Sequence, residues 1–189
     1  MEQLLKERSF PDIGIADLAR KANVSPATIY QRFSNVDATA SVLLELYFNK
    51  VEEWARRSGR PLSGAGVPLQ DALQAMAGDA LDQVYTLGHI MRAAYLYSRL
   101  HPDRVGTRWS ELQKMALEGF RAFVRSRSSE VAIKNLDDGG EVLCQLFNFQ
   151  LLGPLLHAEE AAWKSESQRR RFADQLAELA FRYLQYRPQ

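Results

Sequence analysis

The sequence predicts an all-α fold in which a three-helix head with a helix-turn-helix is joined by a long helix to a larger helical body. Apolar residues recur at spacings of three and four along most of the chain, which is typical of amphipathic helices. No stretch shows the alternation of apolar and polar residues that β-strands and hairpins require. At 189 residues and 46% apolar content, the chain can bury a sizeable core.

Residues 2–8 are expected to form a short first helix, with Leu4 and Leu5 pointing inward. Residues 14–33 then predict two short helices around a tight turn. Gly14 is a suitable N-cap for the first of this pair, and Asn23 suits the left-handed backbone of the turn. The expected inward residues of this helix and turn are Leu18, Ala19, Ala22 and Val24.

The second helix of the pair is expected over residues 26–33. Ser25 is its N-cap and Pro26 its first residue, where the missing N–H of proline costs nothing. Many helical hairpins share such features without touching nucleic acid. Here, however, the outward face combines small residues with a Thr, a Gln and an Arg, which suit base edges and phosphates. We therefore interpret the pair as a helix-turn-helix whose second helix enters the DNA major groove. Ile29 and Phe33 fall on its inner face, and Ala27, Thr28, Gln31 and Arg32 on its outer face.

This stretch resembles the tetracycline-repressor (TetR-type) family of transcriptional regulators. The resemblance is carried by Asp17-Leu18-Ala19, by Ala22-Asn23-Val24-Ser25, and by Pro26-Ala27-Thr28-Ile29-Tyr30-Gln31-Arg32-Phe33 followed by Asn35. It covers roughly the first quarter of the chain, and the remainder matches in helical character and length. It implies a homodimeric, ligand-responsive regulator, most simply a repressor. Such a protein binds double-stranded operator DNA and is released by a small-molecule effector, which is unknown here.

The resemblance also implies DNA-binding roles for residues of the second helix, of which Pro26 is the first. Ala27 is expected to contact base edges, and Thr28 both a base and the DNA backbone. Tyr30 and Arg32 are expected to bond phosphates, and Gln31 to add sequence preference.

The chain departs from the family pattern at positions that usually bond phosphate. Val36 stands where a Lys usually begins the fourth helix, Ile13 and Gly14 replace a Thr/Ser pair, and Ala16 replaces a basic residue. Residues 1–57 carry eight Lys or Arg and eight Asp or Glu, a net charge of zero, which counts mildly against DNA binding. Three basic residues can still gather on one face: Arg20, Lys21 and Arg32.

A long helix is expected after the helix-turn-helix, with Asn35 as its cap and Asp37 at its positive end. It runs to about Arg57, and residues 62–68, rich in Gly and Ser, form the linker. The predicted domains are a DNA-binding domain over 1–57 and a ligand-binding and dimerisation domain over 69–189. The inward stripe of the long helix is Leu43, Leu46, Tyr47, Val51, Trp54 and Ala55.

Helical spacing continues through the body. One helix is expected from Leu69 to Leu87, and a further one from Ile90 to the region of His101. Another is expected over residues 105–125, followed by a polar loop over 126–135. The inward residues of the third of these helices are Trp109, Leu112, Ala116, Phe120 and Phe123, and the loop is anchored by Val131 and Ile133.

The last two helices have the features of an interaction surface. The first, over residues 138–160, is apolar on more than one face and is expected to kink at Pro154. The second begins with a capping box, Ser165 with Gln168. Together they suggest a four-helix interface with a second copy, although two such helices can also close a monomer core. The apolar stripe of the last helix is Phe172, Leu176, Leu179, Ala180, Tyr183 and Leu184.

The prediction of a small-molecule site in the body is based mainly on the resemblance. Aromatic and Met side chains from at least four helices, relieved by a few polar groups, suit an apolar or amphipathic effector. Such residues line protein cores more often than pockets. The candidates are Met76, Met91, Tyr95, Trp109, Phe120, Phe123, Gln145, Asn148 and Phe149.

The residues nominate no enzyme chemistry, cofactor or metal. Cys144 is alone among apolar residues, and the three His residues show no metal-ligand spacing. Phosphate loops, nucleophile elbows and paired carboxylates are missing. No run is long enough to span a membrane and no leader is evident, so a cytoplasmic location is expected. The alternative to a DNA-binding regulator is a non-enzymatic helical ligand- or partner-binding protein with a degenerate head.

Overall fold

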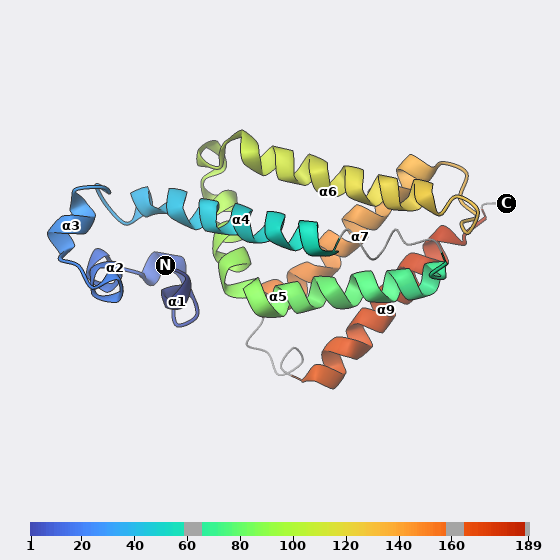
Figure 1. Cartoon of the computed structure of the whole chain (residues 1–189), viewed down its shortest axis with the longest axis horizontal. Coiled ribbons are helices and arrows are strands. Elements are labelled where there is room, and N and C mark those ends of the chain that lie inside the picture. The colour runs from blue at the N-terminus through green and yellow to red at the C-terminus, as the bar shows by residue number, and fades with distance from the viewer. Residues whose placement is uncertain (59–65, 158–164, 188–189) are drawn as a thin grey trace. The chain divides into compact units, whose positions relative to one another are not determined.

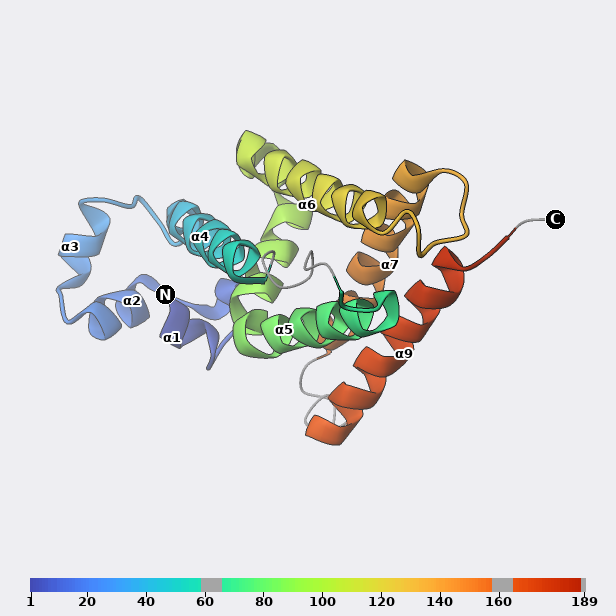
Figure 2. The ribbon, with the colours of Figure 1, turned by 45° about the vertical axis from the view of Figure 1, so that its right-hand side comes forward.

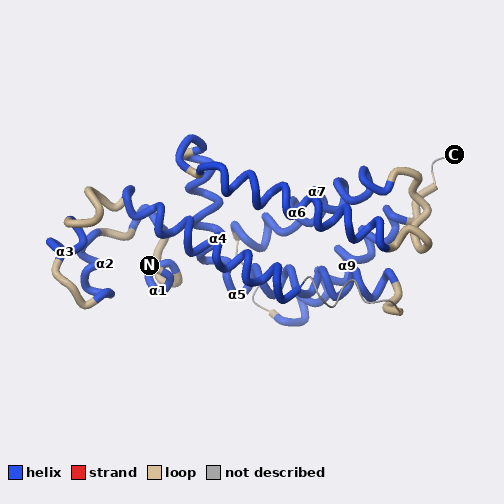
Figure 3. The backbone as a smooth tube through the Cα atoms, turned by 45° about the horizontal axis from the view of Figure 1, so that its top comes forward, coloured by secondary structure: helices blue, strands red, loops and turns tan. Residues whose placement is uncertain are grey.

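The computed structural model describes residues 1–58, 66–157 and 165–187. Every regular element within these ranges is a helix and none is a strand, so the all-α prediction is confirmed (Figure 3). Among the helices of these ranges, none combines the length and the apolar character needed to cross a membrane. The expected linker falls mostly on residues 59–65, and the expected end of the penultimate helix on residues 158–164, both outside the described residues.

Short helices come first along the chain and long helices follow (Figure 1). The 3₁₀ helices are marked η. The elements are α1 (Glu2–Leu5), η1 (Phe10–Asp12), α2 (Ile15–Ala22), α3 (Pro26–Tyr30), η2 (Asp37–Thr39), α4 (Ala40–Ser58), α5 (Leu69–Leu100), η3 (Pro102–Arg104), α6 (Gly106–Ser126), α7 (Leu136–Leu156) and α9 (Glu166–Leu184).

The chain folds into two compact units. The first comprises Met1–Glu52 and Leu87–Gly106, and the second Glu53–Thr86 and Thr107–Gln189. Helices α4 and α5 each contribute residues to both units. The end of α5 and η3 therefore pack with the amino-terminal helices, which the sequence pattern did not indicate. The functional division into domains 1–57 and 69–189 stays a prediction.

Helix α5 is continuous over 32 residues, so the predicted break between Leu87 and Ile90 is wrong. No proline interrupts it, and a glycine inside a helix, such as Gly88, costs only about 1 kcal/mol relative to alanine. Buried positions recur at helical spacing in both parts of the helix, and this burial outweighs the cost of the glycine. They are Leu73, Ala77, Leu81 and Val84 in the second unit, and Ile90, Ala94 and Tyr97 in the first.

The core of the second unit is built by side chains from α5, α6, α7 and α9. Fully burying one large aliphatic side chain contributes roughly 1.5–3 kcal/mol, so the most enclosed residues dominate its stability. Two residues of the predicted stripes are exceptions, because Ala116 and Leu179 are exposed. The largest of the fully buried core residues are Leu73, Val124, Leu143, Leu176 and Leu184.

Helices α6 and α7 approach each other closely at Gly140, in the first turns of α7. A Cβ atom at Gly140 would lie 2.5 Å from the Cα atom of Arg121, a distance that real side chains do not adopt. A Cβ atom at the neighbouring Gly139 would lie 2.1 Å from the side-chain tip of Ile133, in the preceding loop, rather than from a backbone atom. Gly140 is therefore the glycine that permits this helix crossing.

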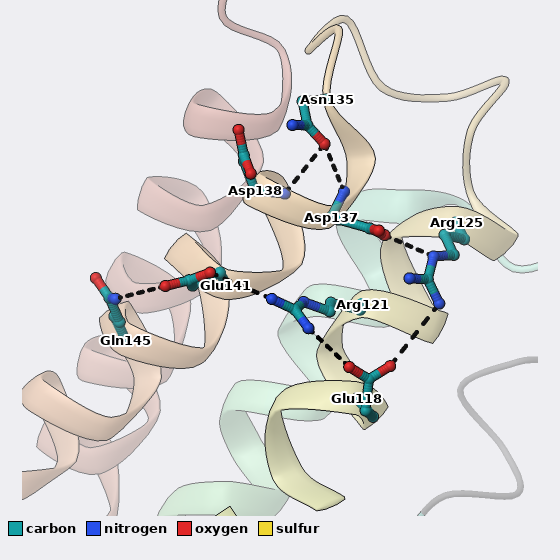
Figure 4. A network of polar contacts seen from close by, with 8 residues as sticks. All are labelled: Glu118, Arg121, Arg125, Asn135, Asp137, Asp138, Glu141 and Gln145. Carbon is teal, nitrogen blue, oxygen red and sulfur yellow. Dashed lines mark hydrogen bonds and ion pairs between the residues drawn. The ribbon is translucent and has the colours of Figure 1, made fainter. Parts of the chain in front are cut away.

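An ion-pair network borders the crossing of α6 and α7 (Figure 4). Arg121 donates to Glu118 at 2.7 Å and to Glu141 at 3.3 Å, and Arg125 donates to Asp137 at 2.6 Å. The bond to Glu118, and after it the contact with Glu141, holds the pKa of Arg121 above its ordinary value. At the start of α7, the side chain of Asn135 accepts the backbone N–H groups of Asp137 and Asp138 and so caps the helix.

A buried arginine holds the loop after α6. Arg127 is only 6% exposed, and its guanidinium donates to the Glu130 carboxylate at 3.0 Å. Glu130 in turn accepts the backbone N–H of Leu69, the first residue of α5, at 2.8 Å. The pairing with Arg127, and then the Leu69 bond, lower the pKa of Glu130. The predicted loop is confirmed, and Val131 and Ile133 pack against the core as expected.

The closing helices α7 and α9 pack against each other. Pro154 lies inside α7, which continues to Leu156. Ser165 is the N-cap of α9 as predicted, but its hydroxyl lies 2.7 Å from that of Ser167 and caps no backbone N–H. The predicted capping box with Gln168 is therefore wrong, because the Ser165 hydroxyl is engaged by a side chain instead.

Candidate nucleic-acid interface

The helix-turn-helix is built from α2, a left-handed turn and α3, which pack against each other (Figure 2). Gly14 is the N-cap of α2, as predicted. Asn23 directly follows the last residue of α2 and has the predicted left-handed backbone, with φ 54° and ψ 44°. Helix α2 buries Ile15, Leu18 and Ala19. The inward placement predicted for Ala22 and Val24 is wrong, because the turn lies at the surface and leaves both residues exposed.

Helix α3 is capped by Ser25, whose Oγ accepts the Thr28 N–H at 3.2 Å and lies 3.0 Å from Thr28 Oγ1. The α-helix ends at Tyr30 rather than at the predicted residue 33, although the Phe33 N–H still bonds the Ile29 carbonyl at 2.9 Å. Ile29 and Phe33 are half-buried, as predicted. Helix α3 is therefore short, its first turn is capped by Ser25, and its outer face is correspondingly short.

All six residues with an expected DNA contact are exposed on or just after α3. Tyr30 keeps 57% of its surface exposed. Arg32 is exposed and forms no ion pair within the described part of the chain, so its guanidinium is available to a phosphate. The six exposed residues are Pro26, Ala27, Thr28, Tyr30, Gln31 and Arg32.

Three other basic residues of this region, Arg8, Arg20 and Lys21, are already paired. Asp17 binds the guanidinium groups of both Arg8 and Arg20, and Lys21 lies 3.5 Å from Glu7. The Gly14 N–H bond, followed by Arg8 and Arg20, holds the pKa of Asp17 below its ordinary value, although burial partly opposes this. Exposed pairs of this kind contribute at most about 1 kcal/mol, so these cations can exchange their partners for phosphates.

The segment after α3 begins with a 3₁₀ turn, and the α-helix α4 starts only at Ala40. The Asn35 side chain accepts the Ala38 N–H at 2.9 Å, but the N-cap of this turn is Val36, so the prediction that Asn35 caps the long helix is wrong. Asp37 forms an ion pair with Arg104 of η3, a residue that sequence reasoning missed. The two residues are 67 positions apart in the chain, and local sequence patterns do not predict contacts between residues so far apart.

The residues expected at an effector site come from three helices rather than four, because α5 is continuous. Phe123 is buried in the core of the second unit, whereas Phe149 is 69% exposed. Two of the residues belong to the first unit and seven to the second. The effector site stays a prediction. Met76, Met91 and Tyr95 lie on α5; Trp109, Phe120 and Phe123 on α6; Gln145, Asn148 and Phe149 on α7.

Cys144 has the surroundings of a core residue. Its Sγ accepts a hydrogen bond from the Asn148 amide at 3.4 Å, and burial raises the pKa of the thiol, which disfavours the reactive thiolate. Within the ranges that the structure describes, no three His, Cys, Asp or Glu residues are grouped to hold a metal ion.

Residues 2–38 match the family described as bacterial regulatory proteins, tetR family. The whole chain is also similar in fold to a solved structure, that of the TetR family transcriptional regulator PfmR from Thermus thermophilus. The TM-score is 0.70 at 14% sequence identity, over 98% of this chain and 96% of that one. The amino-terminal part of the chain thus matches the TetR family, and the whole chain has the fold of a TetR-type regulator. Among curated proteins no match was found.

The family match coincides with the helix-turn-helix of this chain. Residues 2–38 include α1, α2 and α3 and all six exposed residues with an expected DNA contact. DNA-binding transcriptional regulation is therefore the function class of the chain. For the rest of the chain the likeness is one of fold.

Proposed function

We propose that this TetR-type regulator is a homodimeric repressor that a small-molecule effector releases from its operator. The observation that carries the proposal is the outer face of α3. It is capped by Ser25, exposed along its length, and flanked by a tyrosine and by an arginine that forms no ion pair with the described residues. A short polar face with small residues can approach base edges closely and still bond phosphates.

Each residue of this face has a proposed role. Ala27 contacts base edges, and Thr28 contacts a base and the DNA backbone while its hydroxyl also bonds Ser25. Tyr30 and Arg32 bond phosphates, and Gln31 adds sequence preference. Pro26 sets the start of the helix, and with it the position of these side chains.

Two copies of the chain bind DNA together in this proposal. One face as short as that of α3 contacts too few bases for useful specificity. The closing helices supply a surface for pairing, since Val142 and Phe149 on α7 and Leu179 on α9 are exposed. Two α3 helices then enter successive major grooves roughly one helical turn, about 34–36 Å, apart.

The effector is proposed to bind in the helical body, at the aromatic and Met residues of α5, α6 and α7. It releases the operator only if it binds the non-binding conformation more tightly than the DNA-binding one. A tenfold difference in affinity between the two states changes operator binding by at most tenfold.

A paired substitution tests the DNA-contact assignments. The probe is a duplex selected from a random library by the wild-type protein. In a gel-shift titration, Tyr30→Phe with Arg32→Ala is expected to weaken binding roughly tenfold. The salt slope is expected to fall by about one unit for each phosphate that the variant no longer binds. Sedimentation is expected to show an unchanged assembly.

Tyr186→Phe with Arg187→Ala is the matched control, because it removes the same groups from the exposed carboxy-terminal segment. It is expected to bind DNA as the wild type does. Unchanged binding by the Tyr30 and Arg32 variant would refute the assignments made to these two residues.

The second candidate is a non-enzymatic helical ligand- or partner-binding protein with a degenerate head. It is favoured by the pairing of Arg8, Arg20 and Lys21 with carboxylates and by the apolar Val36. The two candidates differ in their salt dependence, since counterion release accompanies only DNA binding. A wild-type protein that enriches no duplex from the library favours this second candidate.

A further inference from the structure

Two side chains near the end of α5 contact the residues that flank the helix-turn-helix. Tyr97 is 6% exposed and places its ring edge-on to that of Phe10, with the centroids 5.8 Å apart. Phe10 precedes α2. Arg104 forms an ion pair with Asp37, which follows α3. The helix-turn-helix is thus held from both sides by residues 97–104, all within the first unit.

Tyr97 and Arg104 are also connected to each other. Tyr97 and Arg104 line the same hollow as Asp37, and Tyr97 together with Asp37 raises the pKa of the Arg104 guanidinium. The ring of His101 packs against Tyr97 with the centroids 4.6 Å apart. Phe10, Tyr97, Arg104 and Asp37 therefore form one continuous chain of contacts, which we call the latch.

The Asp37 end of the latch is attached to a well-defined turn. The Asn35 side chain accepts the Ala38 N–H at 2.9 Å, and the Thr39 hydroxyl donates to the Val36 carbonyl at 2.6 Å. Residues 31–36 alone connect this turn to α3. A displacement of Asp37 is therefore transmitted to the end of the helix that carries the exposed DNA-contact face.

The ion pair of the latch is open to solvent. The side chains of Arg104 and Asp37 are 51% and 42% exposed, and the hollow beside them is lined in part by Ser34 and Ser41. An exposed pair of this kind is weak and easily broken. The same helix α5 that carries Tyr97 also contributes residues 69–86 to the second unit.

We propose that Arg104 is a positioning residue for operator binding, which fixes the orientation of α3 through Asp37 and Tyr97 without touching DNA. The inference rests on the proposed function. A direct phosphate contact is the competing role for this cation. The guanidinium is already paired with the carboxylate of Asp37, and Tyr97 lies beside the pair, which favours positioning.

The test uses the full chain and a duplex that the wild-type protein selects from a random library. Arg104→Gln and Asp37→Asn are each expected to weaken binding about fivefold, as expected for the loss of a weak exposed pair in each of two heads. The double variant is expected to be no weaker than either single one, because both substitutions break the same pair. Arg104→Lys is expected to stay within about twofold of the wild type, because it keeps the pair.

The salt dependence separates positioning from direct contact. For Arg104→Gln, the slope of the logarithm of affinity against the logarithm of salt concentration is expected to equal that of the wild type. A slope reduced by about one unit per head would show that a phosphate is no longer bound and overturn the proposal. Unchanged affinity in Arg104→Gln would overturn it too. Arg99→Gln, an exposed arginine on α5, is the matched control and is expected to bind normally.

A second measurement needs no DNA. Backbone hydrogen exchange of residues 26–38 is expected to be faster in Arg104→Gln than in the wild type, with an unchanged thermal unfolding temperature. Equal exchange in the two proteins would overturn the latch even if no duplex is ever selected. Failure to select a duplex, with faster exchange in the variant, would instead refute the proposed function and leave the latch supported.

Discussion

The Asp17 carboxylate makes three interactions within the helix-turn-helix region. It accepts the Gly14 N–H at 3.1 Å, which satisfies a free donor at the start of α2, and it binds Arg8 and Arg20. Its position near the positive end of the helix adds a further favourable term. One residue thus ties the start of α2 to the end of the first helical segment.

The lowered pKa of Asp17 predicts a pH-dependent contribution to stability. Because the folded-state pKa lies below the ordinary value of 3.8, the contribution is fully present above that value and is lost as the pH falls through the folded-state pKa. Asp17→Asn is therefore expected to lower the melting temperature at neutral pH. The difference from the wild type should shrink in acid. Thermal unfolding followed by circular dichroism across this range is the measurement.

Asp12→Asn is the control for this prediction, since Asp12 is exposed and forms no ion pair within the described residues. It should show no pH-dependent difference from the wild type. A gap between Asp17→Asn and the wild type that stays constant into acid would contradict the assigned role of the charge.

At the scale of single elements, the sequence predicted those features that local chemistry determines. Asn23, Ser25 and Pro26 define the turn and the start of α3, because one residue tolerates a left-handed backbone and the others suit a helix start. Continuity of α5 was not predictable in this way. The residues around Gly88 have modest helix propensity, and burial against partners distant in the sequence decides the outcome.

The crossing of α6 and α7 predicts opposite effects for two glycine substitutions. Gly140→Ala forces a Cβ atom against the Arg121 backbone and is expected to cost roughly 1–3 kcal/mol of unfolding free energy. Gly119→Ala, on α6, meets nothing within 4 Å and is expected to gain up to about 1 kcal/mol from helix propensity. Urea unfolding of both variants measures the difference. Equal stability of the two would show that α6 and α7 do not cross as described.

At the scale of the whole molecule, the packing of residues 87–106 with the amino-terminal helices could not be predicted. The contacts of Tyr97 and Arg104 join residues far apart in the chain, and neither residue belongs to a motif. The candidate DNA interface differs in this respect, since its six exposed residues are consecutive or nearly so. Local periodicity was therefore enough to place them.

The exposed apolar stripe on α7 predicts a test of the proposed dimer. Val142 and Phe149 are two helical turns apart on one face, 37% and 69% exposed. Phe149→Glu would bury a charge in a paired interface and is expected to weaken self-association at least about tenfold. Analytical ultracentrifugation measures the dissociation constant. Met115→Glu, at an exposed apolar position on α6, is expected to leave it unchanged. An intact dimer in Phe149→Glu would place the interface elsewhere.

The shortness of α3 has a consequence for any genomic search. Five helical residues extend about 7–8 Å, which matches the rise of roughly two base pairs. Each half-operator then contains only a few base pairs that the protein discriminates. Each mismatched base pair costs roughly 1–3 kcal/mol of binding free energy. The promoters that this protein binds are consequently expected to share only loosely similar half-sites. The fixed spacing between two half-sites will identify these promoters better than the half-site sequences do.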